Sequence, residues 1–147
     1  MRYAAYALAF FLLLLPAFAA ENLKLNPKLD YTSDSQDGPL ITGSSMEAGF
    51  VPGKPAYIIL YGEGCYNSKR QARRTVELYE TYKGRVQFVI IDLDHPLPPA
   101  QEQLRKAHYR GYIPHVVVLD ASGTAIYDAS GEVEVPVISK TIERALR

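Results

Sequence analysis

The chain has 147 residues, of which 48% are hydrophobic and 22% are charged, a composition typical of one globular domain rather than of a disordered or collagen-like chain. Its 16 basic and 16 acidic residues give a formal net charge of zero, so overall charge gives no support for binding to nucleic acid or to an anionic membrane.

The first 19 residues have the pattern of a secretory signal peptide. Arg2 supplies a positive charge, residues 4–18 form a mostly apolar run, and Ala17-Phe18-Ala19 places small residues at the −3 and −1 positions of a cleavage site. We therefore expect an exported protein, periplasmic or secreted. The alternative is a retained membrane anchor, although the run is shorter than the roughly 20 residues of a full span. Contact with a membrane is expected only if the leader is not cleaved.

Residues 20–53 show no clear periodicity. Residues 30–45 are rich in Ser, Thr, Asp and Gly, which is typical of loops. The stretch V-P-G-K-P at 51–55 then marks a boundary. We expect a partly irregular N-terminal arm over 20–53 and a folded domain over 54–147.

From residue 56 onward, short apolar runs alternate with segments of helical spacing. The apolar runs predict buried strands at 56–61, 86–92 and 115–119, and a D-A-S-G turn predicts that 124–128 returns antiparallel. Apolar residues three and four apart predict helices after Cys65, from Pro98 and from Pro136. Because a helix joins the first two strands, these should be parallel, which predicts a mixed α/β sheet with helices on both faces.

Three features in this order resemble the thioredoxin fold. Cys65 sits between an apolar strand and a helix, Gly111-Tyr112-Ile113-Pro114 leads into another apolar strand, and a hairpin and closing helix follow. Residues 54–147 are therefore identified as a member of the thioredoxin-like superfamily. The resemblance implies a mixed central sheet with helices on both faces and a C-terminal β-hairpin plus helix.

The resemblance also assigns roles. It implies that Cys65 is the nucleophile of the family's C-x-x-C site, and that Ser68 stands where the second, resolving cysteine would be. It implies that Pro114 is the cis-proline facing that cysteine, with Ile113 and His115 beside it in a groove for an extended client strand.

The sequence departs from the family pattern at several positions. The aromatic residue that normally precedes the cysteine is Gly64, and the chain has no tryptophan. The family's buried aspartate would fall at Ile59 and its lysine partner near Ile90, so the usual proton-handling groups are missing. The N-terminal strand and helix of the family are not clear in residues 21–55.

The single cysteine leaves two possibilities for its chemistry. In an exported domain a lone thiol cannot form an internal disulfide, so Cys65 is either buried and inert or reacts outside the chain. A helix N-terminus favours the thiolate form of a cysteine, as do nearby basic residues. The basic residues that follow are Lys69, Arg70, Arg73 and Arg74. The alternative for this basic cluster is a solvated helix face.

Ser68 limits the reaction, because a hydroxyl cannot resolve a mixed disulfide. The expected partners are therefore client protein thiols or disulfides and, as a second thiol source, glutathione, with no cofactor. The rival hypothesis is a non-catalytic binding module of the same fold, in which Cys65 is a relic.

The remaining polar residues give weaker predictions of a functional role. His115 either contacts a client or the thiolate, or is a strand-end histidine partly exposed to solvent; His95 and His108 are expected at the surface, and Glu63 in an exposed loop. No histidine, cysteine or carboxylate group has metal-ligand spacing in the sequence, so no metal is expected.

Overall fold

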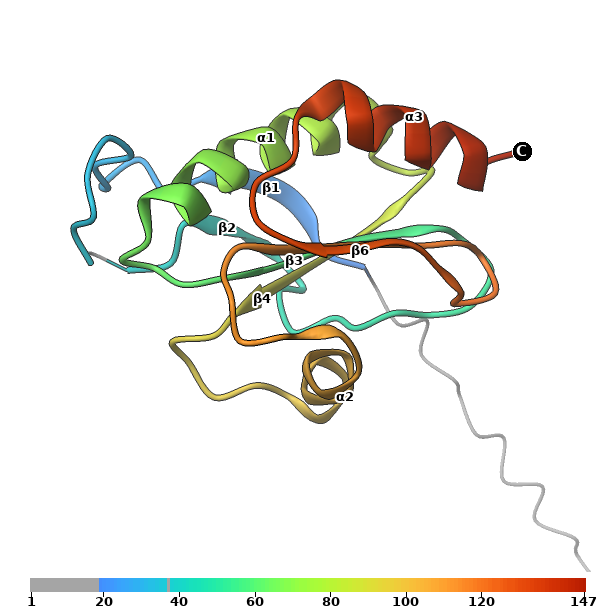
Figure 1. Ribbon diagram of the computed structural model, residues 1–147, viewed down its shortest axis with the longest axis horizontal. Coiled ribbons are helices and arrows are strands. Elements are labelled where there is room, and N and C mark those ends of the chain that lie inside the picture. Colours follow the sequence, from blue (N-terminus) through green and yellow to red (C-terminus); the bar gives the residue numbers. More distant parts are fainter. Residues whose placement is uncertain (1–18, 37) are drawn as a thin grey trace, which may run out of the picture.

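The computed structural model describes residues 19–36 and 38–147, and at its centre is a mixed sheet of four strands in the order β4-β3-β5-β6 (Figure 1). β3 is parallel to β4 and antiparallel to β5, and β5 pairs antiparallel with β6. The bounds are Ala56–Tyr61 for β3, Gln87–Asp92 for β4, His115–Leu119 for β5 and Ala125–Ser130 for β6. The predicted mixed sheet is confirmed.

Within the described residues, three helices cover this sheet. α1 (Tyr66–Tyr82) and α3 (Val135–Ala145) lie on one face, and α2 (Pro99–His108) lies on the other (Figure 1). A proline occupies the first turn of both α2 and α3, where its missing N–H group leaves no hydrogen bond unmade. The α/β architecture with helices on both faces is therefore as predicted.

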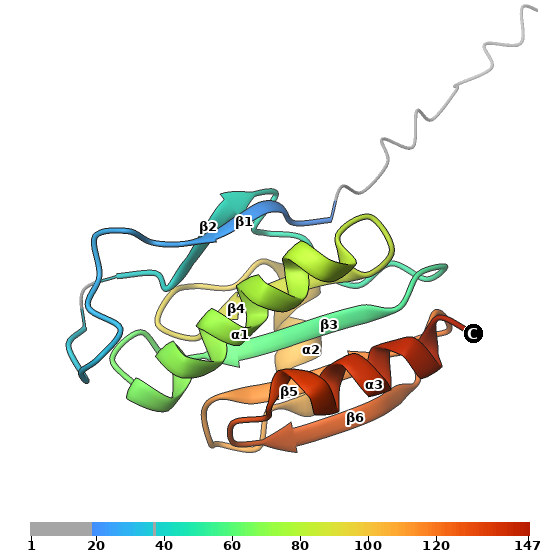
Figure 2. The same ribbon diagram turned by 90° about the horizontal axis from the view of Figure 1, so that it is seen from above.

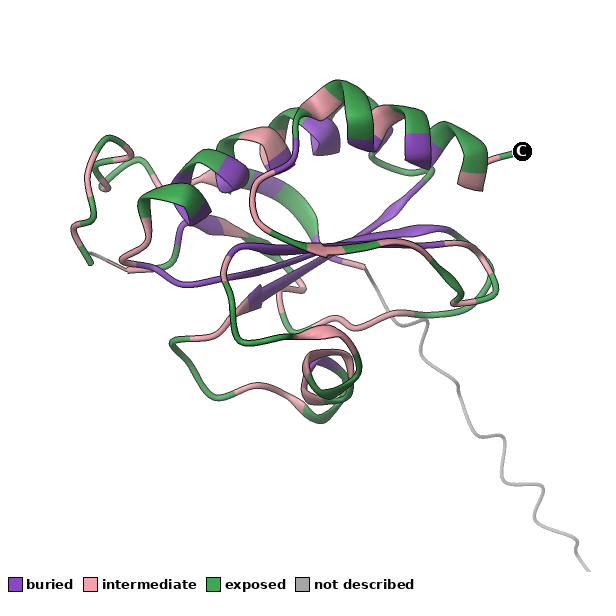
Figure 3. Ribbon diagram, viewed as in Figure 1, coloured by how far each residue is buried: buried purple, intermediate pink, exposed green. Residues whose placement is uncertain are grey.

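β3 lies in the middle of the core. All of its residues are buried, and because successive side chains of a strand point to opposite faces, it contributes to two clusters. Tyr57, Ile59 and Tyr61 pack in the cluster that includes residues of α1 and α3, whereas Ala56, Ile58 and Leu60 pack with the α2 side. Figure 3 shows these buried strands between the helices. Coverage on both faces explains why the strand reads as a continuous apolar run.

The N-terminal arm is more ordered than predicted. β1 (Glu21–Leu25) and β2 (Ile41–Ser44) pair antiparallel in a separate two-stranded sheet that lies on the β4 side of the molecule (Figure 2). Leu23, Leu40 and Ile41 are buried and join the same cluster as α1. The strands are short and their register is irregular between Glu21 and Lys24, so their apolar pattern is too brief to detect in the sequence.

The predicted signal peptide and its alternative, a membrane anchor, fall on residues 1–18, which lie outside the described residues. Over residues 19–36 and 38–147, no helix combines the length and the apolar character that crossing a membrane requires.

Candidate functional site

Cys65 lies at the junction between the end of β3 and the start of α1. It is the N-cap residue of α1, with an extended backbone, and its Sγ atom accepts a hydrogen bond from the Ser68 N–H at 3.5 Å. Its side chain is half-buried. Cys65 therefore lies at a helix N-terminus and is partly open to solvent, unlike a cysteine enclosed in the core.

Ser68 is fully buried beneath this thiol. Its Oγ atom accepts a hydrogen bond from the Gly62 N–H at 3.3 Å, which ties the helix to the end of β3. The hydroxyl is therefore held in a structural contact in the place where the family's second cysteine would be.

The segment before β5 packs against the loop that carries Cys65. The Ile113–Pro114 peptide bond is cis, Pro114 is buried, and its carbonyl accepts a hydrogen bond from the Gly131 N–H at 2.8 Å. Any side chain at Gly62 would collide with Ile113 Cδ1, so the two loops touch. Tyr112 beside them is 73% exposed.

His115 is not the partly exposed strand-end residue that the sequence allowed. It is 1% exposed, and its ring nitrogens contact Ser130 Oγ at 2.9 Å and Asp128 Oδ1 at 2.6 Å. His108 Nδ1 contacts the other carboxylate oxygen at 2.8 Å. Burial alone would raise the pKa of Asp128, but the hydrogen bonds from His108 and His115 outweigh it and lower that pKa. Because both ring nitrogens of His115 are taken, its side chain has none left for a client.

The basic cluster on α1 is not a uniformly solvated face. Lys69 is fully buried, and its ammonium group donates to the carbonyl oxygens of Asp30, Ser33 and Ser35 at 2.7, 2.8 and 2.7 Å. Lys69 therefore fastens the arm to the helix that Cys65 caps.

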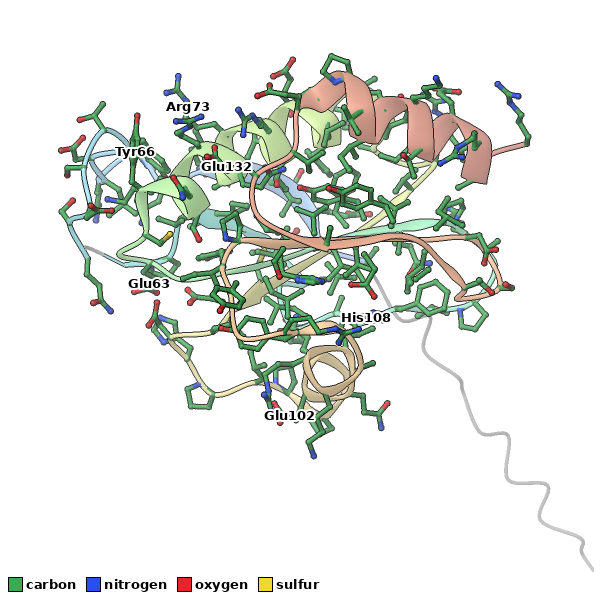
Figure 4. All side chains as sticks on the ribbon, viewed as in Figure 1. Glu63, Tyr66, Arg73, Glu102, His108 and Glu132 are labelled. Carbon is green, nitrogen blue, oxygen red and sulfur yellow. The ribbon has the colours of Figure 1, made fainter. Side chains whose placement is uncertain are left out.

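The three arginines of this cluster differ from one another. Arg70 and Arg74 each contact Glu132 at 2.8 Å. Arg73 points away from the sheet into solvent (Figure 4). The solvated-face alternative therefore describes Arg73 and is wrong for Lys69.

Residues 34–36 of the arm lie against the cysteine loop. Asp34 Oδ1 accepts a hydrogen bond from the Tyr66 N–H at 2.8 Å, and a Cβ atom at Gly64 would lie 3.3 Å from Gln36 Cβ. The arm thus stands beside the position where the family has an aromatic residue. Sequence reasoning missed this contact because its partners lie about thirty residues apart in a stretch without a pattern.

A second polar group lies at the same end of the sheet. Glu63, expected in an exposed loop, is 5% exposed, and its Oε1 contacts His95 Nε2 at 2.5 Å. His95 Nε2 lies 3.7 Å from Asp92 Oδ2, so the three side chains form one cluster. Figure 4 shows Glu63 at the same end of the molecule as Tyr66. The expectation that Glu63 lies in an exposed loop is therefore wrong, and the cluster is one that ligand spacing along the sequence did not reveal.

The surroundings perturb this cluster. Burial, together with a hydrogen bond to the Glu63 carboxyl, raises the pKa of Asp92 to about 7. The hydrogen bond to Glu63 and the charge of Asp92 raise the pKa of His95. One feature of the sequence could have predicted the cluster. Glu63 follows β3 and Asp92 ends β4, and the carboxyl ends of adjacent parallel strands meet at one edge of a sheet.

Ile59 and Ile90 are buried and lie opposite each other in the β3–β4 ladder. The next pair on the same face is Tyr61 and Asp92, joined by a hydrogen bond of 3.2 Å from the tyrosine hydroxyl to Asp92 Oδ2. The titratable pair therefore lies one step nearer the strand ends than the positions at which the resemblance places the family's aspartate and lysine.

Comparisons with known proteins agree with this fold. No family model matches the chain. Over 93 residues the chain is 36% identical to a protein of Synechocystis sp. named thiol:disulfide interchange protein TxlA homolog, covering 61% of this chain and 48% of that protein. The chain thus spans about half the length of this curated relative.

Solved structures show the same arrangement. A malarial protein superposes with a TM-score of 0.53 at 17% identity, covering 65% of this chain and 100% of that one. Thioredoxin-2, described as a component of malaria parasite protein secretion machinery, gives 0.53 at 16% identity over 62% and 82% of the two chains. Chloroplastic thioredoxin z gives 0.50 at 22% identity over 63% and 78%.

Proposed function

We propose that this chain, which shares the fold of thioredoxin-like proteins, is an exported monothiol protein that exchanges disulfides with client proteins through Cys65. The observation that carries the proposal is the position of Cys65, half-exposed at the N-terminus of α1, in a loop whose Gly62 packs against Ile113. The name of the Synechocystis relative, a thiol:disulfide interchange protein, supports the same chemistry.

The proposed reaction begins with the Cys65 thiolate. It attacks one sulfur of a client disulfide, a new Cys65–client disulfide forms, and the other client sulfur leaves as a thiolate. No net oxidation occurs, because one disulfide replaces another. Release requires a second thiolate to attack the mixed disulfide, and this comes from the client itself or from glutathione.

Ser68 explains why release depends on an outside thiol. Its hydroxyl is a far weaker nucleophile than a thiolate, and here it is fully buried and accepts the Gly62 N–H. The protein is therefore suited to shuffle or retain clients rather than to reduce them on its own.

The surroundings of Cys65 suit an extended client segment. Residues 111–113 lie outside the strand ladder, since β5 begins at His115. Tyr66 and Tyr112, which adjoin Cys65 and Ile113 in the chain, are among the few large hydrophobic side chains exposed in the described residues. Exposed aromatic rings bind apolar surface while keeping a polar tip in water, so they fit a role in client contact.

Export forms part of the proposal and rests on the leader pattern of residues 1–19. Mass spectrometry of the mature protein should find an N-terminus at Ala20 or Glu21. An N-terminus that retains the apolar run would favour the membrane-anchored alternative.

A capture experiment separates thiol exchange from the rival, a binding module. Wild type and Cys65→Ala are expressed in their native compartment, thiols are blocked rapidly, and complexes are isolated without reductant. We expect client adducts that disappear both on reduction and in the variant. Adducts that persist unchanged in both cases would favour the binding module, for which the apolar Ile59–Ile90 pair is the supporting observation.

A further inference from the structure

The Glu63–Asp92–His95 cluster plays no part in the proposed thiol exchange, and its geometry suggests a separate role. Its ligand atoms, a carboxylate oxygen from each acidic residue and a ring nitrogen from His95, all lie within 4.8 Å of one another. The three residues come from different segments: the loop after β3, the last residue of β4 and the loop that follows β4.

Among the described residues, His95 is the one basic side chain that pairs with the two carboxylates of this cluster. The Glu63 side chain is only 7% exposed, and in the described part of the chain its carboxylate contacts only members of the cluster. The ion pairs of Glu63 and Asp92 within residues 19–36 and 38–147 likewise involve only His95, and no lysine or arginine. A buried carboxylate beside a half-buried one is costly unless a cation or a shared proton lies between them.

Hydrogen bonds from outside the cluster hold the two acidic residues in place. The Tyr61 hydroxyl donates to Asp92 Oδ2 at 3.2 Å, and the Asp94 N–H donates to Asp92 Oδ1 at 3.0 Å. The Glu63 N–H donates to Asp94 Oδ2 at 2.6 Å, which fixes the backbone of the loop. Outer hydrogen bonds of this kind orient the ligands of protein metal sites.

The cluster also opens onto a cavity. Asp92 and His95 line a cavity of about 450 Å³, whose wall is otherwise mainly apolar and includes Ile41, Met46 and Leu97. A group bound between the three side chains would therefore keep one side free for water or another ligand.

We propose that Glu63, Asp92 and His95 bind a divalent transition-metal ion, best Zn²⁺, with a fourth coordination position facing this cavity. One imidazole nitrogen and two carboxylate oxygens suit Zn²⁺, whereas Mg²⁺ and Ca²⁺ prefer oxygen ligands alone. Ligand atoms about 2.0–2.2 Å from one tetrahedrally coordinated ion lie about 3.3–3.6 Å apart. His95 Nε2 lies 2.5 Å from Glu63 Oε1, so His95, whose side chain is 54% exposed, must move outward by about 1 Å to admit the ion.

The test is a zinc titration of the full chain, stripped with EDTA, in competition with a chromogenic chelator. It is made in a Cys65→Ala background, so that the thiol cannot supply a ligand and the result does not depend on the proposed disulfide chemistry. We expect one Zn²⁺ per chain, with affinity at least about tenfold weaker in His95→Ala and in Glu63→Gln. Cobalt(II) should give the visible absorption of a four-coordinate ion, which His95→Ala removes.

Two matched controls should leave zinc affinity unchanged: Glu47→Gln, an acidic residue lining the same cavity, and His108→Ala, a histidine outside the cluster. The proposal is overturned if no stoichiometric zinc binds, in which case the carboxylates share a proton instead. It is equally overturned if binding survives His95→Ala. Because the His95 side chain is 54% exposed, this variant should fold and decides the matter even if Glu63→Gln does not.

Discussion

Two regions at the same end of the sheet are built in different ways. The Cys65 region consists of one contiguous loop and helix start, with the Ile113–Pro114 segment against it. The Glu63–Asp92–His95 cluster joins segments that lie up to 32 residues apart. The first presents a thiol with apolar Ile59 and Ile90 in place of titratable partners, whereas the second gathers titratable groups without a thiol.

The titratable pair of this chain lies one step further along the strands than Ile59 and Ile90. Tyr61 and Asp92 form the next pair on the same face as Ile59 and Ile90. Burial and the nearby Asp92 carboxylate raise the pKa of Tyr61, so its hydroxyl remains a hydrogen-bond donor to Asp92. Thiol chemistry and proton or cation binding can then be altered separately by mutation.

Ser68→Cys should have the largest effect on the thiol region. A second thiol at this buried position would attack the mixed disulfide within the same molecule. Intramolecular reactions reach effective molarities far above any external thiol concentration, so the lifetime of the mixed disulfide should fall by at least about a hundredfold. Quenched-flow trapping with a model disulfide measures this lifetime, and an unchanged lifetime would contradict the roles assigned to Cys65 and Ser68.

Lys69→Met tests whether the arm is fastened to the thiol region. The variant leaves three backbone carbonyls of residues 30–35 without the ammonium donor. We expect the free energy of unfolding to fall by about 2–3 kcal/mol. Denaturant unfolding measures it, with Arg73→Met on the same helix as the exposed control, expected within about 0.5 kcal/mol of wild type. Equal losses of unfolding free energy in both variants would show that Lys69 does not fasten the arm to the helix.

Gly64→Trp restores an aromatic residue before the cysteine and should disturb the arm. Because a Cβ atom added there would already lie 3.3 Å from Gln36 Cβ, the indole must displace residues 34–36. Overpacking of this kind costs about 1–3 kcal/mol. We expect a lower unfolding midpoint and faster proteolysis within the arm, while a variant as stable as wild type would show that the arm does not occupy this space.

A separate prediction concerns how protein stability depends on pH when no metal ion is bound. The pKa of Asp92 is raised from 3.8 to about 7 by burial and by the Glu63 carboxyl. The folded protein therefore keeps a proton between about pH 4 and 7 that the unfolded chain releases, and stability falls as pH rises through this window. The pKa of His95 is also raised, so stability should fall further as pH rises above the ordinary pKa of histidine.

Asp92→Asn should flatten this decline between about pH 4 and 7, since asparagine has no proton to lose. The measurement is denaturant unfolding in EDTA at several pH values. A decline of the same slope in wild type and variant would show that another group carries it.

The sequence predicted the elements whose signals are local. The bounds of β3 and β5 match the predicted strands at 56–61 and 115–119, because buried strands read as short apolar runs. α1 was also predicted, because apolar residues recur three and four apart along it; Ala72, Tyr79 and Tyr82 are buried, whereas Val76 is only half-buried.

Features that depend on distant partners were missed. The sequence allowed Lys69 to be a surface cation, but residues 30–35 supply carbonyl oxygens to its ammonium group. It also predicted an exposed Glu63, which instead contacts His95 and lies beside Asp92. A search for ligands spaced along the chain cannot detect three residues that only strand pairing brings together. The places of Cys65 and Ser68 at one helix start follow from local sequence, whereas the roles assigned to them are what the family resemblance implies.

The most direct test of the central claim is to identify the residue that forms the mixed disulfide. The full chain is incubated with a disulfide-containing model peptide, quenched with acid, and analysed by mass spectrometry beside Cys65→Ala. The account predicts an adduct that maps to Cys65, persists until glutathione is added and is absent in the variant. A wild-type chain that forms no adduct, although its Cys65 reacts with a small alkylating reagent, would contradict it.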